Sequence, residues 1–439
     1  MNVDVRDLPI TVANDLALAA YERAVAGYLA QKRDTMDQLD AALAADPEFV
    51  LAHCLKAYLL RMAYDPAFLP AARNSVTAAE KASAGATERE QRQVAAARLL
   101  LNENVLEALA ILDGIAIDYP ADLMILKLTQ FTHFWRGDAS NMRDVIGRAL
   151  YAWEAGMPGY GFVLGMLSFG FEESGEYEPA ERVGREAVDL NPEDSWAVHA
   201  VAHTLEMEGR HADGIDWLKQ TEPGWLENNN FRFHLWWHRS LYHLERGEID
   251  EVLDLYDTGI RGEKTDFATD IANGSALLWR LALRGTDVGD RWEELGTRAE
   301  AHARDAVNTF FNANYMMALL ATGRRDAADV LVAAMRNDTA RHDPGASRAV
   351  DAGVAISEGL RAFHDKDYGR AVDLMLPVRY DLYLFGGSHA QRDVFDQTLV
   401  LSAIRSGRDA LTRALVAERE TRHRQVPEVW KAEAGMAAN

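Results

Sequence analysis

Helical periodicity constrains this chain more than any other feature of its sequence. Apolar residues recur at i, i+3, i+4 and i+7 over most of the length, as in Leu18, Tyr21 and Val25, which would share one helix face. Dipeptides typical of turns, such as Asp46-Pro47 and Gly247-Glu248, separate these stretches. Alternating patterns typical of strands are not found. We therefore expect an all-α chain of short antiparallel helix hairpins.

The clearest internal repeat runs from Gly161 to Asp194. Its aromatic, small and helix-ending residues have the spacing of a tetratricopeptide unit of about 34 residues, namely Leu167, Phe171, Gly175, Tyr177, Ala180, Ala187 and Pro192. Weaker copies follow, with Gly209, Gly247 and Gly323 at the same turn position. Stacked hairpins of this kind bury a continuous core and present one concave face. The fold class that we predict is a superhelical α-solenoid of tetratricopeptide-like hairpins.

We expect a single α-solenoid domain over residues 1–439. Residues 12–158 would form the N-terminal hairpins, residues 159–260 the clearest repeats, and residues 261–439 the C-terminal hairpins. Several turn signals fall inside each of these ranges, which favours repeated short hairpins over separate globular domains.

Composition and charge argue against several kinds of binding partner and against a membrane-spanning or secreted protein. The chain has 46 basic and 68 acidic side chains, a formal net charge of −22, which repels nucleic acid and anionic membrane surfaces. No apolar run approaches the roughly 20 residues that a membrane span needs. Cys54 is the only cysteine, so no intrachain disulfide is available. We expect a cytoplasmic protein without a secretory signal.

Two histidine pairs give the strongest functional signal. His199 and His203, and likewise His234 and His238, are four residues apart, so each pair shares one side of a predicted helix. Glu206 extends the first stripe by three residues. Counted within the repeat, these positions fall on the first helix of consecutive hairpins, which lines the groove. The sequence therefore predicts a histidine-rich polar pocket in the concave groove.

Three segments resemble one particular family. The stretch from Asp194 to Met207 and the stretch from His234 to Gly247 resemble motifs of the tetratricopeptide repeat 38 family. The block Gly386 to Phe395 is similar to that family's C-terminal signature. The resemblance extends over roughly residues 15 to 425. It implies a superhelical all-α protein and no particular reaction.

Further candidates for the pocket come from this resemblance and from nearby aromatic residues. In the C-terminal block, Gln391 and Arg392 would bind substrate and Asp393 would supply a carboxylate for catalysis. His389 is left out, because the family pattern does not require histidine at that position. Asp270 and Asn312 lie in segments that resemble helices of the family and are weaker candidates. Aromatic side chains could form apolar walls around a small ligand. The full set beyond the histidines and Glu206 is Gln391, Arg392, Asp393, Asp270, Asn312, Trp236, Trp237 and Tyr160.

One interpretation of the histidines is metal binding. Imidazoles bind zinc, iron, nickel or copper, so His199, His203, His234 and His238 could hold a divalent transition metal. Glu206 would then be a ligand or would fix the tautomer of one histidine. The H-E-x-x-H signature of zinc proteases is absent.

A second interpretation is acid–base catalysis without a metal. His203 and His238 would act as base or ligand, with His199 and His234 as their partners. Glu206 or Asp393 would orient an imidazole, while Arg392 would bind a carboxylate of the substrate. Both interpretations predict a small organic molecule that is hydrolysed or loses a leaving group by elimination.

The third interpretation is structural. Histidine and tryptophan on helix faces often hold adjacent hairpins together, and Ser388 could simply cap a helix that contains Arg392 and Asp393. The protein would then be a non-catalytic scaffold that binds a protein or peptide partner. The segment Ala410 to Arg424 is a candidate homodimer interface. The sequence alone leaves these three interpretations open.

Overall fold

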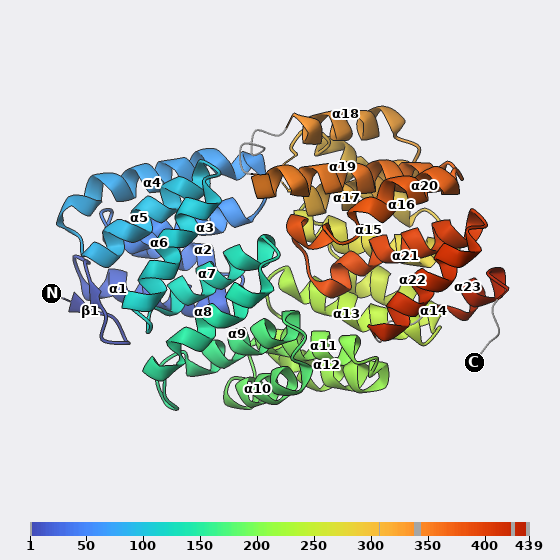
Figure 1. Cartoon of the computed structure of the whole chain (residues 1–439). Coiled ribbons are helices and arrows are strands. Elements are labelled where there is room, and N and C mark those ends of the chain that lie inside the picture. The colour runs from blue at the N-terminus through green and yellow to red at the C-terminus, as the bar shows by residue number, and fades with distance from the viewer. Residues whose placement is uncertain (1, 307, 338–343, 423–425, 436–439) are drawn as a thin grey trace. The chain divides into compact units, whose positions relative to one another are not determined.

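The helices of this computed structural model form two compact units, and the structure describes residues 2–306, 308–337, 344–422 and 426–435. Figure 1 shows the helices coloured along the chain. The first unit comprises Met1–Phe134, Asp138–Val201 and Gln220–Arg232, and the second comprises Trp135–Gly137, Ala202–Lys219 and Phe233–Asn439. The single domain over residues 1–439 stays a prediction.

The first unit opens with a two-stranded antiparallel ribbon, in which Asn2 pairs with Ile10 and Val3 with Pro9. Its strands, its helices and its 3-10 segments are β1 (Asn2–Val3), β2 (Pro9–Ile10), α1 (Asp15–Leu29), α2 (Thr35–Ala45), α3 (Val50–Met62), η1 (Pro66–Phe68), α4 (Leu69–Ala82), η2 (Ser83–Gly85), α5 (Glu88–Leu101), α6 (Val105–Asp118), α7 (Leu123–Trp135), α8 (Ala139–Ala149), η3 (Leu150–Ala152), α9 (Tyr160–Glu173) and α10 (Tyr177–Leu190).

The division between the units passes through four continuous helices, which are α7, α11 (Ser195–Met207), α12 (His211–Trp225) and α13 (Phe231–Glu245). The helices of the second unit are α13 (Phe231–Glu245), α14 (Ile249–Leu255), the π-helical η4 (Tyr256–Ile260), α15 (Ala268–Leu283), α16 (Arg291–Ala301), α17 (Thr309–Ala321), α18 (Arg325–Arg336), α19 (Pro344–His364), α20 (Tyr368–Met375), η6 (Leu376–Val378), η7 (Leu382–Phe385), α21 (His389–Arg405), α22 (Asp409–Thr421) and α23 (Glu428–Glu433).

Consecutive helices pack in pairs, as α1 with α2, α9 with α10, α19 with α20 and α21 with α22 do. The turn inside a pair often contains a glycine with positive φ, a conformation that side chains with a Cβ rarely adopt. Gly175, Gly209, Gly247 and Gly323 have φ values of 78°, 71°, 74° and 69°. Gly209 follows Gly175 by 34 residues, and Gly247 follows Gly209 by 38. The predicted all-α fold of tetratricopeptide-like hairpins is confirmed.

The first helix of a pair is more deeply buried than the second. In the second unit, nearly every residue of α15 and α17 is buried, including Asp270, Asn273 and Asn312. By contrast, α18 buries one stripe around Leu331 and exposes the opposite side. Polar side chains on the first helices are therefore enclosed by protein, where they need hydrogen-bond partners.

No helix in the described part of the chain is both long and apolar enough to cross a lipid bilayer.

A glycine sets how closely α12 and α13 approach within the second unit. A Cβ added at Gly214 would lie 2.4 Å from Cζ of the Tyr242 ring. That ring cannot rotate away freely, because the Tyr242 hydroxyl donates a hydrogen bond to the Ala202 carbonyl oxygen at 2.5 Å. The close approach therefore depends on the missing side chain.

Replacing Gly214 by alanine should lower the free energy of unfolding by about 1–3 kcal/mol, because the added methyl group overpacks the contact with Tyr242. Denaturant unfolding monitored by circular dichroism would measure the change. Gly147 in α8 is the matched control, since a Cβ there would meet nothing within 4 Å. Gly147→Ala should be neutral or stabilising by up to about 1 kcal/mol. Equal effects of the two substitutions would contradict this account of the packing.

Candidate functional site

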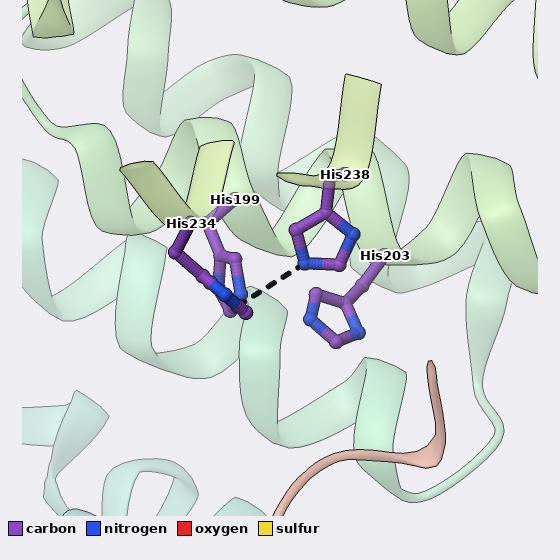
Figure 2. Close-up of side chains that lie close together, drawn as sticks. All are labelled: His199, His203, His234 and His238. Carbon is purple, nitrogen blue, oxygen red and sulfur yellow. Dashed lines mark hydrogen bonds between the residues drawn. The ribbon is translucent and has the colours of Figure 1, made fainter. Parts of the chain in front are cut away.

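Three of the predicted histidines lie together in the second unit. His203 comes from α11, while His234 and His238 lie one turn apart on α13, so the helical spacing brings their rings to the same side (Figure 2). The ring centroid of His238 is 4.4 Å from that of His203 and 4.7 Å from that of His234. All three are buried. The two predicted stripes therefore face each other.

Hydrogen bonds fix the orientation of two of these rings. Nδ1 of His238 lies 3.0 Å from a carboxylate oxygen of Glu206, and Nδ1 of His234 lies 3.1 Å from Oδ1 of Asn273. Both partners are oxygen acceptors, so each Nδ1 carries the proton. The Nε2 atoms of the two rings are then left facing each other, 3.3 Å apart (Figure 2).

His199 joins this group through the helix that it shares with His203. The division between the units falls after Val201, but α11 is continuous, so His199 sits one turn before His203. One ring nitrogen from each of His199, His203, His234 and His238 lies within 4.8 Å of the others. We call these four residues the histidine cluster. His199 also contacts the rings of Phe169 and Trp196, with centroids 5.2 and 5.3 Å away.

Burial sets the protonation state of His234. Desolvation lowers the pKa of His234 well below its ordinary value, and the neighbouring His238 lowers it further, while the hydrogen bond to Asn273 acts in the opposite direction. His234 is therefore a neutral imidazole at physiological pH. The neutral ring is the form whose free nitrogen binds a metal ion or accepts a proton.

A tryptophan and an arginine border the cluster. The Trp237 ring stacks on His234 with centroids 5.2 Å apart and planes at 12°. The Arg280 guanidinium lies 5.5 Å from the centroid of the Trp237 ring. Burial lowers the pKa of Arg280 to about 10, whereas the charges of Asp393 and Glu206 raise it. Arg280 therefore interacts electrostatically with Glu206 on α11 and with Asp393 on α21.

The sequence reasoning missed Asn273 and Arg280. Both project from α15, where they are seven residues apart and so lie on one helix face. The available signal in the sequence was that these two polar side chains share one face of a helix rich in apolar residues. The hydrogen bond that His234 donates to Asn273 could not be predicted from the sequence, because the two residues belong to different hairpins.

The C-terminal block is held largely by its own contacts. Ser388 caps α21, accepting from the Gln391 backbone N–H, while the Gln391 side chain accepts from the Ser388 N–H, so the predicted cap is confirmed. Arg392 donates to the Gly387 carbonyl oxygen. Asp393 accepts two hydrogen bonds from Arg419, at 2.7 and 3.2 Å. Substrate binding by Gln391 and Arg392 and catalysis by Asp393 stay predictions.

The weaker candidates lie at separate places. Trp236 is on a different side of α13 from the histidines and packs against Gly259. Asp270 is buried and accepts a hydrogen bond from the Thr265 hydroxyl at 2.5 Å. Asn312 is buried in α17, and Tyr160 is half-buried at the start of α9 in the first unit. Their role in binding also stays a prediction.

The candidate dimer segment, Ala410 to Arg424, covers most of α22, and its residues 423 and 424 lie outside the described residues. Leu415 and Val416 are buried, and α22 packs against α21 of the same chain. That face of the helix is therefore already covered within the chain.

Comparison with known proteins gives distant structural likenesses. No family model matches the chain. A structure described as Naa15/Naa10 bound to HypK-THB is 12% identical, with a TM-score of 0.27 over 91% of this chain and 68% of that chain. The P58(IPK) TPR domain is 12% identical, with a TM-score of 0.20 over 78% and 88%. The description of the fold as tetratricopeptide-like rests on the helix pairing and turn spacing given above.

The buried ion pair between Asp393 and Arg419 should stabilise the second unit. Asp393→Ala would leave the Arg419 guanidinium buried without its carboxylate, so the free energy of unfolding should fall by about 3–5 kcal/mol. Chemical denaturation would measure the loss.

An exposed pair on a nearby helix provides the control. Asp373 of α20 forms an ion pair with Arg408 at 2.7 Å, but both side chains are solvent-exposed. Asp373→Ala should therefore leave the unfolding free energy nearly unchanged. If Asp393→Ala were as mild, Asp393 would not have the structural role assigned to it.

Proposed function

We propose that this protein binds a divalent transition metal, of which zinc is the best fit, at the histidine cluster. The metal would serve the hydrolysis or elimination of a small organic molecule. Neutral imidazole is a preferred ligand of zinc, copper, iron and nickel. A metal ion of this kind polarises a carbonyl group and activates water. The tetratricopeptide-like hairpins would provide the rigid frame on which the ligands are carried.

The distance between two nitrogen atoms carries the proposal. In a tetrahedral zinc site with Zn–N bonds of about 2.0–2.1 Å, neighbouring nitrogens are about 3.3–3.4 Å apart. The Nε2 atoms of His234 and His238 are 3.3 Å apart. Two lone pairs at this separation repel each other, and a cation between them would convert that repulsion into attraction.

The partners of the two Nδ1 atoms support the same proposal. Histidines that bind metal almost always donate their other N–H to a carboxylate, a carbonyl or water, which fixes the tautomer and makes the ligand nitrogen more basic. Glu206 has this relation to His238, and Asn273 has it to His234. Both Nε2 atoms are thereby oriented before any ion binds.

The number of ligands decides between a structural and a catalytic ion. Four histidine ligands would close a tetrahedral site, whereas three would leave one position for water or substrate. His203, His234 and His238 lie together in the second unit, and His199 also belongs to an aromatic group with Trp196 and Phe169. We propose that His203, His234 and His238 are the ligands and that water or substrate takes the fourth position.

The predictions on family, cellular location and substrate binding are part of the same proposal. The protein would be a member of the tetratricopeptide repeat 38 family and would act in the cytoplasm. Trp237 would provide an apolar wall for the small organic molecule, and Arg392 would bind its anionic group. A scaffold for a protein partner is the function that would replace this one if no metal binds.

Elemental mass spectrometry of tag-free protein purified without chelator should find close to one transition-metal ion per chain. The double variant His203→Ala/His238→Ala should lose it, because two of the three ligands are removed. His364, on α19 outside the cluster, is the control, and His364→Ala should keep the full metal content. Metal-free wild-type protein that also fails to take up added zinc would contradict the proposal.

Glu206 allows a finer test of the hydrogen bond to His238. Glu206→Ala should weaken zinc affinity about 10–100-fold, because it removes the acceptor that orients the ring. Glu206→Gln should keep most of the affinity, since its amide oxygen can still accept from Nδ1. Competition titration with a chromogenic chelator would measure both. Equal losses for the two variants would show that the charge of Glu206, rather than its acceptor oxygen, supports the site.

A further inference from the structure

The first unit contains a buried lysine unlike every other buried cation of the described chain. Six arginines are buried, and each donates hydrogen bonds to carbonyl or carboxylate oxygens; they are Arg89, Arg232, Arg261, Arg280, Arg392 and Arg419. Lys127 on α7 is 2% exposed, yet its Nζ has no hydrogen-bond partner among the described residues. Because buried polar groups are normally paired, this ammonium group needs another explanation.

The use of lysine rather than arginine at position 127 suggests what this explanation is. The chain has 38 arginines and 8 lysines, and Lys127 is the one lysine that is buried in the described structure. Arginine stays protonated in proteins, whereas a buried lysine can readily become a neutral amine. Where this chain needs a buried structural cation it uses arginine, so a lysine at this position points to amine chemistry.

Aromatic rings surround the amine. Nζ of Lys127 lies 3.2 Å from the centroid of the Trp196 ring and 5.7 Å from that of Phe131. Phe169 packs edge-on against Trp196, with centroids 4.9 Å apart. These residues come from α7, α9 and α11 of the first unit. The faces of the rings attract an ammonium group, but they offer it no hydrogen-bond acceptor, and burial among them removes the water that would solvate the charged form.

A buried carboxyl group completes the arrangement. Oδ1 of Asp194 accepts hydrogen bonds from the backbone N–H groups of Trp196 and Ala197, both at 3.0 Å, and so caps α11. Its Oδ2 has no hydrogen-bond partner among the described residues. It faces Gly165, where an added Cβ would lie 2.7 Å away. Asp194 and Lys127 attract each other electrostatically, yet no ion pair within 4.0 Å joins them.

Burial shifts both groups toward neutrality. Desolvation lowers the pKa of Lys127 to about 7, although Asp194 opposes the shift. Desolvation likewise raises the pKa of Asp194 to about 7, against its two backbone hydrogen bonds and Lys127. Near neutral pH the pair can therefore exist as a free amine beside a carboxylic acid.

We propose that Lys127 is a nucleophilic amine that forms an imine with the carbonyl group of a small aldehyde or ketone, with Asp194 as its proton donor and acceptor. This site lies in the first unit and does not depend on the metal proposed for the histidine cluster. A reactive lysine in an apolar setting is a recurrent way to activate an amine for covalent chemistry.

The reaction balances without any further reagent. The Nζ lone pair attacks the carbonyl carbon, a C–N bond forms, and the carbonyl π electrons move to oxygen, which takes a proton from Asp194. The nitrogen then returns a proton to the Asp194 carboxylate. Loss of the hydroxyl group as water, with a second proton from Asp194, leaves a protonated imine beside the Asp194 carboxylate, and return of that proton to the carboxylate gives the neutral imine. The net change is amine plus carbonyl compound giving imine plus water.

Reductive trapping tests the proposal in the folded wild-type chain. The full-length protein would be treated at pH 7 with acetaldehyde and cyanoborohydride for short times, and each lysine peptide would be quantified by mass spectrometry. Lys81 is exposed on α4 and serves as the control within the same molecule. Lys127 should be ethylated at least about tenfold faster, because an ordinary lysine is almost entirely protonated at this pH. Labelling of Lys127 no faster than that of Lys81 would overturn the proposal.

The role of Asp194 has its own measurement. Asp194→Asn keeps an oxygen acceptor for the helix cap but cannot transfer a proton, so it should slow ethylation of Lys127 severalfold and leave Lys81 unchanged. An unchanged rate at Lys127 would exclude Asp194 as the proton donor and acceptor. The circular dichroism spectrum of the variant must match that of the wild-type chain, because unfolding would give Lys127 the pKa of an ordinary lysine and slow its ethylation without changing the exposed Lys81.

Discussion

The hydrogen bonds to Nδ1 of His234 and His238 are the interactions on which the candidate site depends. Each bond fixes one tautomer and one ring orientation, so two Nε2 atoms meet at 3.3 Å in a buried environment. Without Glu206 and Asn273 the same imidazoles could turn, and the geometry that suits a metal ion would be lost. The site is therefore a property of three helices, α11, α13 and α15, rather than of the histidines alone.

The fold explains why such a site can exist in this chain. The first helix of a hairpin is covered on nearly all sides, so polar residues on it are removed from water and must find partners within the protein. Small residues such as Gly214 allow the helices to approach closely enough for those partners to meet. The desolvation that makes these polar residues costly also lowers the pKa of His234 and of Lys127.

The sequence was sufficient for the hairpins and for the histidine stripes, because both follow from the period of a helix. Turn glycines such as Gly209 and the i, i+4 spacing of His234 and His238 are local features. The contacts of Asp393 were out of reach, since its partner Arg419 lies 26 residues away on another helix. Lys127 was missed for a related reason. Phe131 is on its own helix, but Trp196 and Phe169, which complete its burial, come from two other helices and could not be predicted from a local pattern.

The coordination of a bound ion is the most direct test of the central claim. X-ray absorption at the zinc edge, recorded on protein loaded with one equivalent of zinc, would report the ligands in the protein as it exists in solution. Our account predicts that the zinc is coordinated mainly by imidazole nitrogens at about 2.0–2.1 Å, with three histidines and one oxygen ligand from water. A shell of oxygen ligands alone, as in a hydrated or loosely held surface ion, would contradict it.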